Sequence, residues 1–246
     1  GHAGARAVVL LLLMLYLTWL AHRTWERTED WRSDETLFKA GVQVCPTSAK
    51  MQRQMAVLYQ NRGEHDQALK HIRESKRIDP DYCEVDLDLA YHYFHLNDVG
   101  RCTKYFRKSL QCPFTADKAF VNLQEIFSKL YFPTQNVSAY EEFGDILTEI
   151  GLNSEAAIHY REAAVLAMKG DQLATSTRAL RKAQRAAPTR CDLLWWRGQL
   201  FEKKRKYQAA AETYHEVLEC SGEESENAQN VARQSLVLLQ NVLYEA

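Results

Sequence analysis

Two histidines are the first residues of this chain whose types and spacing could do chemistry. His92 and His95 lie one helical turn apart, where two imidazoles could share a metal ion. No glutamate accompanies them in a zinc-hydrolase arrangement, so we interpret both as surface histidines. Paired acids such as Glu141 and Glu142 are interpreted as a solvated helix face. With no glycine-rich phosphate loop and no nucleophile elbow either, we assign no catalytic, metal or cofactor site.

A second group of residues could bind a polypeptide. Aromatic side chains flank acidic ones at slots that a helical pattern places on one groove, and this combination suits an extended or glycosylated polypeptide. The candidates are Tyr91, Phe94, His95, Glu142, Asp145, Trp195, Trp196 and Gln199. The alternative for Trp195 and Trp196 is that each ring simply packs against its neighbours.

The composition excludes one class of partner and favours one class of fold. Lys and Arg number 31 and Asp and Glu 32, for a net charge of -1, so the chain lacks the basic footprint of a nucleic-acid binder. Only 10 Gly and 5 Pro occur among 246 residues, which favours helices over many short strands. We therefore expect a helical protein that binds no nucleic acid.

Six cysteines are scattered along the chain without a Cys-x-x-Cys pair, which excludes both a zinc framework and a small disulfide scaffold. Cys45, Cys112 and Cys220 each end an expected helix, and we interpret them as ordinary packing residues. One disulfide is compatible with the sequence if the chain lies in an oxidising compartment.

The elements that position the candidates are helices that recur along the chain. Small residues, an aromatic, a glycine, a large apolar residue and a proline occur at fixed positions: Ala56, Tyr59, Gly63, Ala68, Ile72 and Pro80. A shift of 34 positions brings Ala90, Tyr93, Cys102 and Phe106 into the same slots. This pattern is typical of tetratricopeptide repeats, in which small residues let two antiparallel helices approach closely.

Farther along the chain the period changes from 34 to 54. Gly144 and Gly198 follow Ala90 at steps of 54, and the helix-capping types Asp117, Asp171 and Ser225 follow the same step. The surplus equals one helix and a turn, with extra helices expected over 117–131, 171–187 and 225–244. The alternative is an irregular array with two unrelated single-helix insertions. Either way the prediction is an all-α, tetratricopeptide-like helical solenoid.

These periods predict an order of domains along the chain. They are a transmembrane helix at 1–25, a joint with an incomplete repeat at 26–48, one repeat at 49–82, and units of a repeat plus an extra helix at 83–136, 137–190 and 191–246.

One stretch is apolar enough to cross a membrane. Residues 7–21 carry no charge, and with the small residues before them they reach about 20 residues, the length of a helical span. A signal peptide is the rival interpretation, but His22, Arg23 and Trp25 offer no small-residue cleavage site. A buried core helix is another alternative. Flanking charges do not settle the orientation, and we expect the chain to be the C-terminal part of a longer protein.

The chain holds one N-glycosylation sequon, Asn136-Val137-Ser138. It falls in an expected loop, where an acceptor asparagine must lie, so Asn136 is a candidate modification site and a reporter of compartment.

The joint after the apolar stretch carries a motif that resembles a known family. The matching residues are Asp30, Trp31, Glu35, Leu37, Phe38, Gly41, Cys45, Pro46, Ala49 and Lys50. Their spacing, between a membrane span and repeats, is similar to that of the transmembrane and TPR-repeat-containing O-mannosyltransferase family. The chain departs from that family in its 54-residue steps and in Ser48, where an asparagine is usual.

The resemblance implies a multispanning enzyme of the endoplasmic reticulum that transfers mannose from dolichyl-phosphate mannose to Ser or Thr of acceptor proteins. It also implies lumenal repeats that help to present the acceptor. The catalytic acids of such enzymes lie upstream, so no catalytic role passes to a residue of this chain, and the mannosyl donor belongs to the parent protein. The second hypothesis is a non-enzymatic, membrane-anchored scaffold with a cytosolic array that binds a protein partner.

Overall fold

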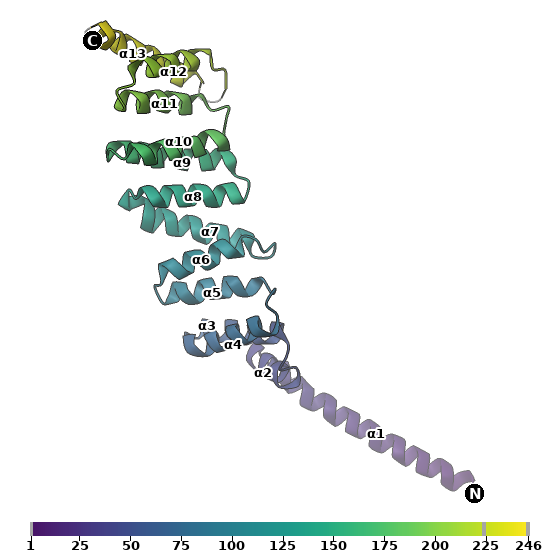
Figure 1. Cartoon of the computed structure of the whole chain (residues 1–246). Coiled ribbons are helices and arrows are strands. Elements are labelled where there is room, and N and C mark those ends of the chain that lie inside the picture. The colour runs from purple at the N-terminus through teal and green to yellow at the C-terminus, as the bar shows by residue number, and fades with distance from the viewer. Residues whose placement is uncertain (1, 223–224, 245–246) are drawn as a thin grey trace. The chain divides into compact units, whose positions relative to one another are not determined.

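The computed structural model describes residues 2–222 and 225–244, and every regular element in these ranges is helical (Figure 1). The elements are α1 (His2–Asp30), α2 (Asp34–Val44), α3 (Ala49–Asn61), α4 (His65–Ile78), α5 (Glu84–His95), α6 (Val99–Ser109), α7 (Ala116–Ile126), η1 (Phe127–Tyr131), η2 (Phe132–Thr134), α8 (Val137–Glu149), α9 (Asn153–Lys169), α10 (Leu173–Ala186), α11 (Cys191–Lys203), α12 (Tyr207–Glu219) and α13 (Ser225–Tyr244). The all-α, tetratricopeptide-like fold predicted from the sequence is confirmed. The chain forms two compact units, Gly1–Phe120 and Val121–Ala246, and each is described by itself.

Helix α1 is long and apolar enough to cross a membrane. The candidate span runs from Arg6 to Asp30, and none of its most apolar part is buried against other helices. The predicted span, residues 7–21, lies within it, and a run of large apolar side chains from Val8 to Leu20 is exposed. The alternative of a buried core helix is therefore wrong.

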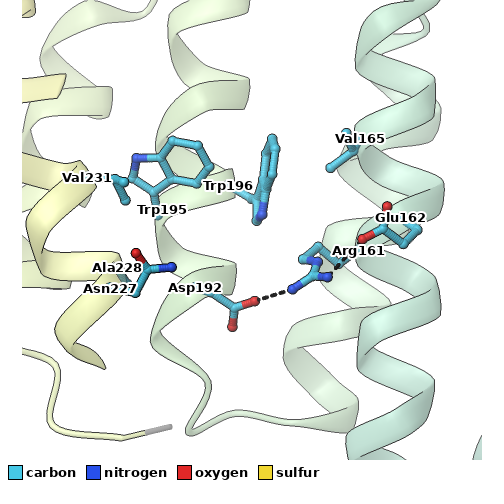
Figure 2. Close-up of a pocket in the computed structure, with 9 residues that line it drawn as sticks. All are labelled: Arg161, Glu162, Val165, Asp192, Trp195, Trp196, Asn227, Ala228 and Val231. Carbon is cyan, nitrogen blue, oxygen red and sulfur yellow. Dashed lines mark hydrogen bonds and ion pairs between the residues drawn. The ribbon is translucent and has the colours of Figure 1, made fainter. Parts of the chain in front are cut away.

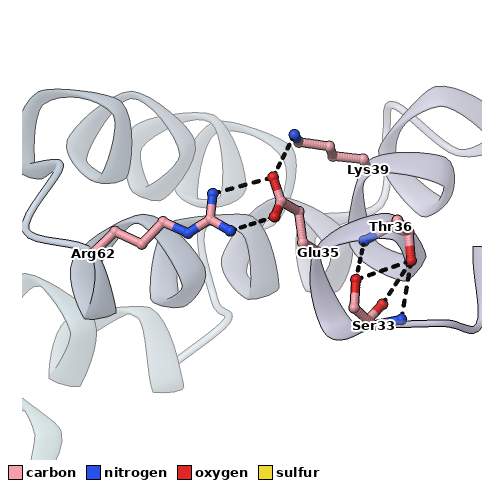
Figure 3. Close-up of polar contacts among 5 residues, drawn as sticks. All are labelled: Ser33, Glu35, Thr36, Lys39 and Arg62. Carbon is pink, nitrogen blue, oxygen red and sulfur yellow. Dashed lines mark hydrogen bonds and ion pairs between the residues drawn. The ribbon is translucent and has the colours of Figure 1, made fainter.

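Local hydrogen bonds start α2 and attach it to the first complete repeat (Figure 3). The Ser33 hydroxyl accepts from the backbone N–H of Thr36, and the Thr36 hydroxyl accepts from the backbone N–H of Ser33, which forms a capping box. The Glu35 carboxylate accepts hydrogen bonds from Arg62 at the end of α3 and from Lys39 one turn along α2. These two cations hold the pKa of Glu35 at about 2.

In the N-terminal unit, α3 and α4 pack as the repeat pattern predicts. Ala56 and Ala68, the two small residues of the pattern, are both fully buried. Gly63 ends the first helix with a φ of 73°, a left-handed conformation that glycine adopts without strain. Because small side chains meet where the helices cross, a close helix pair forms around Ala56 and Ile72.

In the C-terminal unit, the repeat pattern places a glycine against a tyrosine of the next helix. A Cβ added at Gly144 on α8 would lie 2.6 Å from Cε1 of Tyr160 on α9. Gly198 on α11 meets Tyr214 on α12 in the same way, at an even closer approach. Both glycines therefore allow a tyrosine ring to lie directly on the backbone of the preceding helix.

The three extra helices lie close to the predicted ranges, but the predicted capping by Asp117 and Asp171 is wrong, because Asp117 lies inside the first turn of α7 and Asp171 precedes Gln172, the residue before α10. Helix α10 and helix α13 occupy the ranges expected after Asp171 and at Ser225. The helix expected over 117–131 is α7 followed by one π-helical turn, η1. The grouping of these helices into 54-residue units stays a prediction.

A longer period, of 108 residues, relates two parts of the chain in detail. We call residues 49–112 the first segment and residues 157–220 the second segment. Cys191 follows Cys83 by 191 − 83 = 108 positions, and the same shift carries Arg53 onto Arg161. It also carries α4, from His65 to Ile78, onto α10, from Leu173 to Ala186.

Backbone geometry follows the same 108-residue shift. Asn97 and Arg205 both adopt left-handed conformations, with φ of 55° and 56°, and Gly63 corresponds to Asp171, whose φ is 58°. A shift of 54 covers three helices and so exchanges the two faces of an alternating array, whereas a shift of 108 covers six helices and restores each face. The longer shift carries the helix pairs α3–α4 and α5–α6 of the first segment onto α9–α10 and α11–α12 of the second.

Two disulfides occupy equivalent positions in the two segments. Cys83 is bonded to Cys112 and Cys191 to Cys220, each pair with a sequence separation of 29. The interpretation of Cys112 and Cys220 as ordinary packing residues is therefore wrong. Each bond joins the start of one helix to the end of the next helix, and local sequence patterns do not show that these two points meet. Cys45 is free and exposed.

Candidate functional site

A pocket of about 320 Å³ opens in the C-terminal unit where α9, α11 and α13 run beside one another (Figure 2). Its lining combines aliphatic, aromatic, charged and amide side chains: Arg161, Glu162 and Val165 from α9, Asp192, Trp195 and Trp196 from α11, and Asn227, Ala228 and Val231 from α13. We call it the tryptophan pocket. It lies at the lower end of the volume range of small-ligand sites, about 300–1,000 Å³.

The two tryptophans form one wall of this pocket. Their ring centroids are 4.6 Å apart and the ring planes meet at 69°, so the indoles stand nearly perpendicular to each other. Trp195 packs against the apolar cluster around Tyr214 and donates from Nε1 to the Ser235 hydroxyl at 3.4 Å. Trp196 packs against the cluster around Leu180. Each ring is half-buried, so it both packs on its neighbours and borders the pocket.

Two arginines fix the carboxylate at the base of the tryptophan pocket. Arg161 donates to Oδ2 of Asp192 at 2.8 Å, and Arg190 donates to both oxygens of Asp192 at 3.0 Å. A second nitrogen of Arg161 donates to Glu162 at 2.8 Å. Burial alone would raise the pKa of Asp192, but the hydrogen bonds from Arg190 and Arg161 hold it below its ordinary value. The carboxylate is therefore ionised and held in one orientation.

The first segment has a counterpart of this site, which we call the arginine pocket. It has a volume of about 520 Å³ and is lined by Ala49, Lys50, Arg53 and Gln54 of α3 together with Asp79, Tyr82 and Glu84. The shift of 108 carries Arg53 onto Arg161 and Glu84 onto Asp192. In both segments an arginine thus pairs with an acid two helices later.

The two sites differ in how the arginine is held. Arg53 donates from Nε to Oδ2 of Asp88 at 2.6 Å and from Nη1 to Glu84 at 3.1 Å. The position equivalent to Asp88 is occupied by Trp196 in the second segment, and the position equivalent to Tyr82 is occupied by Arg190. At the arginine pocket Arg53 is therefore held between two carboxylates of α5, whereas the tryptophan pocket has an aromatic ring at the position of one of them.

The predicted groove residues Tyr91, Asp145 and Gln199 occupy one shared slot, and the structure shows what that slot contacts. Tyr91 packs edge-on against Phe106 at 5.4 Å, while Asp145 accepts a hydrogen bond from the Tyr160 hydroxyl at 2.6 Å. Gln199 donates to the Tyr214 hydroxyl at 2.7 Å. In each case the partner is the aromatic residue of the next helix, so this slot joins consecutive helices and supplies no lining residue to the tryptophan pocket. Burial and the bond to Asp145 raise the pKa of Tyr160 to about 12.

Helix α8 does not contribute to the tryptophan pocket either. Its Asp145 accepts a hydrogen bond from Lys182 on α10 at 2.7 Å, and Glu141 pairs with Arg178 on the same helix. The predicted residue Glu142 is exposed on α8. Helix α11 is the third helix after α8, so a step of 54 leads to the opposite face of the array within this unit. For this reason Glu142 and Asp145 lie apart from Trp195 and Trp196.

The candidates of α5 belong to the N-terminal unit. Phe94 is exposed, and His95 is exposed with its ring 5.4 Å from that of His65. His92 is only 2 % exposed, so its interpretation as a surface histidine is wrong. Among the residues with described positions, no group of three or more His, Cys, Asp or Glu side chains is arranged to hold a metal ion.

Asn136 is exposed and caps the N-terminus of α8. Its side-chain oxygen accepts a hydrogen bond from the backbone N–H of Ser138 at 2.9 Å. The side chain is therefore on the surface, as an acceptor of a glycan needs to be, and it also stabilises the start of a helix.

The sequence is similar to curated O-mannosyl-transferases. It is 30% identical over 104 residues to protein O-mannosyl-transferase TMTC1 of Mus musculus. The aligned region covers 42% of this chain and 10% of that relative. It is 26% identical over 123 residues to protein O-mannosyl-transferase Tmtc3 of Drosophila melanogaster. The aligned region covers 50% of this chain and 11% of that relative. The resemblance seen in the joint motif is confirmed. The chain spans about a tenth of the length of these relatives, and no protein-family model matches it.

Solved structures of TPR proteins align with the chain. YrrB, described as a TPR protein with an unusual peptide-binding site, is 14% identical with a TM-score of 0.36 and covers 78% of this chain and 97% of its own. The P58(IPK) TPR domain is 14% identical to this chain with a TM-score of 0.34. The alignment covers 94% of this chain and 66% of the P58(IPK) chain.

Proposed function

We propose that this chain is the repeat region of an endoplasmic-reticulum membrane protein that transfers mannose from dolichyl-phosphate mannose to Ser or Thr of acceptor proteins. The repeats lie in the lumen and bind the acceptor polypeptide, α1 crosses the membrane, and the catalytic residues lie in another part of the protein. The similarity to curated O-mannosyl-transferases supports the reaction class.

The observation that carries the lumenal placement is the pair of equivalent disulfides, Cys83–Cys112 and Cys191–Cys220. Disulfides persist in oxidising compartments such as the lumen of the endoplasmic reticulum and are rare in the reducing cytosol. A proposal that places the repeats in the lumen accounts for both bonds. The scaffold alternative, with a cytosolic array, leaves four cysteines in bonding positions without an oxidant.

The tryptophan pocket supports the binding of an acceptor. Half-buried tryptophans give large contact area at little entropic cost, and they are over-represented among the residues that dominate binding energy. Trp195 and Trp196 border an open pocket and are flanked by fixed polar groups. An acceptor segment that fills this pocket would bury both indoles further and leave the ion pair in place.

The placement is tested by the gel mobility of the full-length protein in microsomes, with and without N-glycan removal. Asn136→Gln alone is ambiguous because Asn136 also caps α8. Ser138→Ala abolishes the sequon and keeps the capping side chain, so it is the matched variant. We expect a glycan shift that both substitutions abolish, together with protection of the repeats from added protease. No shift and cleavage in intact microsomes would place the array in the cytosol and favour the scaffold.

A further inference from the structure

We propose that the tryptophan pocket binds a neutral hexose, held against the indole of Trp196, and that the ligand is a mannosyl group already attached to an acceptor. This inference rests on the proposed function and names what the same site recognises. It assigns to the array the capture of glycosylated segments in addition to unmodified ones.

The charges of the pocket argue for a neutral ligand. The guanidinium of Arg161 is paired with Glu162 and Asp192, and Asp192 is paired again with Arg190. Two cations and two anions therefore cancel one another within hydrogen-bonding distance. A charged ligand group would have to break one of these pairs in a partly buried site, which costs more than it returns unless the new pair is as well formed.

The arrangement of apolar and polar groups matches a sugar ring. A hexose has an apolar face of C–H groups and a rim of hydroxyls, each of which can donate and accept a hydrogen bond. Trp196 and Val165 provide apolar surface at the pocket. Around them stand carboxylates that accept, on Glu162 and Asp192, and an exposed side-chain amide on Asn227 that donates and accepts.

The size of the pocket limits the ligand. A volume of about 320 Å³ suits one small ring better than a folded motif of several side chains. The two indole planes meet at 69°, so the ring of Trp195 stands at an angle beside that of Trp196. A single sugar unit fits such a corner, and the peptide to which it is attached extends beyond the pocket.

The first segment supplies an internal control for this inference. Its arginine pocket has Asp88 in the position of Trp196, and that carboxylate is already bonded to Arg53. The aromatic face is therefore absent from the position of Trp196, and the one aromatic ring in the lining of the arginine pocket, Tyr82, has the guanidinium of Arg53 6.0 Å from its centroid. We expect one hexose per chain, bound in the second segment.

The test is a calorimetric titration of the full chain, in a detergent without a sugar head group, with a threonine peptide in O-mannosylated and unmodified forms. We expect the mannosylated peptide to bind about tenfold more tightly, the gain that one aromatic stacking contact and its hydrogen bonds supply. Free α-methyl mannoside should abolish that advantage in the unaltered protein. Trp196→Ala should abolish it too, Trp196→Phe should reduce it, and Trp31→Ala, an exposed tryptophan outside the pocket, should leave it unchanged.

Each other outcome rejects a defined part of the account. Equal affinity of the two peptides overturns the hexose site and leaves acceptor binding intact. An advantage that survives Trp196→Ala in a protein of unchanged helicity also overturns it. Failure of both peptides to bind contradicts the proposed acceptor-binding function itself, while tight binding of unrelated charged peptides would show that the pocket selects charge.

Discussion

The first segment and the second segment share a frame of helices, cysteines and one arginine–acid pair, yet they differ in what this frame presents. Asp88 is nearly buried and meets one arginine, and burial raises its pKa although Arg53 opposes the shift. Burial acts on Asp192 in the same direction, but two arginines lower its pKa below the ordinary value. As the pH falls, Asp88 therefore takes up its proton before Asp192 does.

The same arrangement of helices and cysteines presents different side chains in the two segments. In the first segment Arg53 donates to Asp88 and Glu84, so its guanidinium ties α3 to α5. In the second segment Arg190 provides additional donors to Asp192, which leaves the position of Asp88 open for Trp196. At this position the first segment has an ion-paired carboxylate, Asp88, that stabilises the fold. The second segment has Trp196, whose aromatic ring borders a pocket.

The largest expected effect separates the two arginines. Arg53→Ala leaves Asp88, whose side chain is 5% exposed, with no guanidinium, and a broken buried ion pair costs about 3–5 kcal/mol of unfolding free energy. Arg161→Ala leaves Asp192 with both hydrogen bonds from Arg190, so we expect a loss of about 1–2 kcal/mol. Urea unfolding of both variants, followed by circular dichroism, checks the difference. Equal losses would contradict the contrast between the segments.

Removal of either disulfide should lower the free energy of unfolding by the same amount in the two segments. Both bonds close loops with a separation of 29, so removal of either by paired Cys→Ser substitution should cost about 3–4 kcal/mol. Cys45→Ser is the control, because Cys45 is free and exposed. Urea unfolding under non-reducing conditions measures the three variants. A stability loss for only one pair would show that the cysteines are not equivalent.

The tryptophans test the surface of the second segment. Trp195→Ala combined with Trp196→Ala should weaken binding of an acceptor peptide by about 2 kcal/mol, the size of a binding hot spot, without unfolding the array. Isothermal calorimetry measures the affinity and circular dichroism the helicity. A loss of helicity would show that the rings are core residues and that the pocket is not a binding site.

The helix contacts within the second segment should tolerate little extra volume. At Gly198 an added Cβ would overlap the ring of Tyr214, so Gly198→Ala should destabilise the protein by about 1–3 kcal/mol. Gly100→Ala is the matched control, since the nearest atom to its added Cβ is 3.9 Å away. Thermal unfolding compares the two variants. The first segment already has Ala90 at the equivalent position, opposite Phe106, so an unaffected Gly198→Ala would mean that both segments accept either residue.

The smallest effect lies outside both segments, where Glu35 attaches α2 to the first one. Hydrogen bonds from Arg62 and Lys39 lower the pKa of Glu35 to about 2. Because the folded pKa is depressed, the contribution is present above the ordinary value of 4.5 and is lost as the pH falls from there towards 2. Acid titration of Trp31 fluorescence should show this step, and Glu35→Gln should remove it. Glu74→Gln, whose partner Arg77 lies in the same helix, should keep the step.

Much of the fold follows from local signals in the sequence. The 54-residue spacing of Asp171 and Ser225 predicts the ranges of α10 and α13, although Asp171 does not cap α10, and the small residues Ala56 and Gly144 mark where helices approach. The disulfides could not be read from such signals, because Cys83 and Cys112 meet only through the packing of two helices. A self-comparison at 108 would have aligned all four bonded cysteines.

The groove candidates show a second limit of sequence reasoning. The 54-residue step aligned Tyr91, Asp145 and Gln199, and all three contact the aromatic residue of the next helix. Period alone does not report the face of a helix, because an odd number of helices per step exchanges the faces. Trp195 and Trp196 border the pocket because α9, α11 and α13 lie on one side.

The most direct test of the central claim is disulfide mapping by mass spectrometry of the full-length protein, isolated from cells with its free thiols blocked at lysis. The account predicts two cross-linked peptides, Cys83 with Cys112 and Cys191 with Cys220, and blocked thiols at Cys45 and Cys102. Blocked thiols at all six cysteines would contradict the lumenal placement and the stabilising frame that the two segments share.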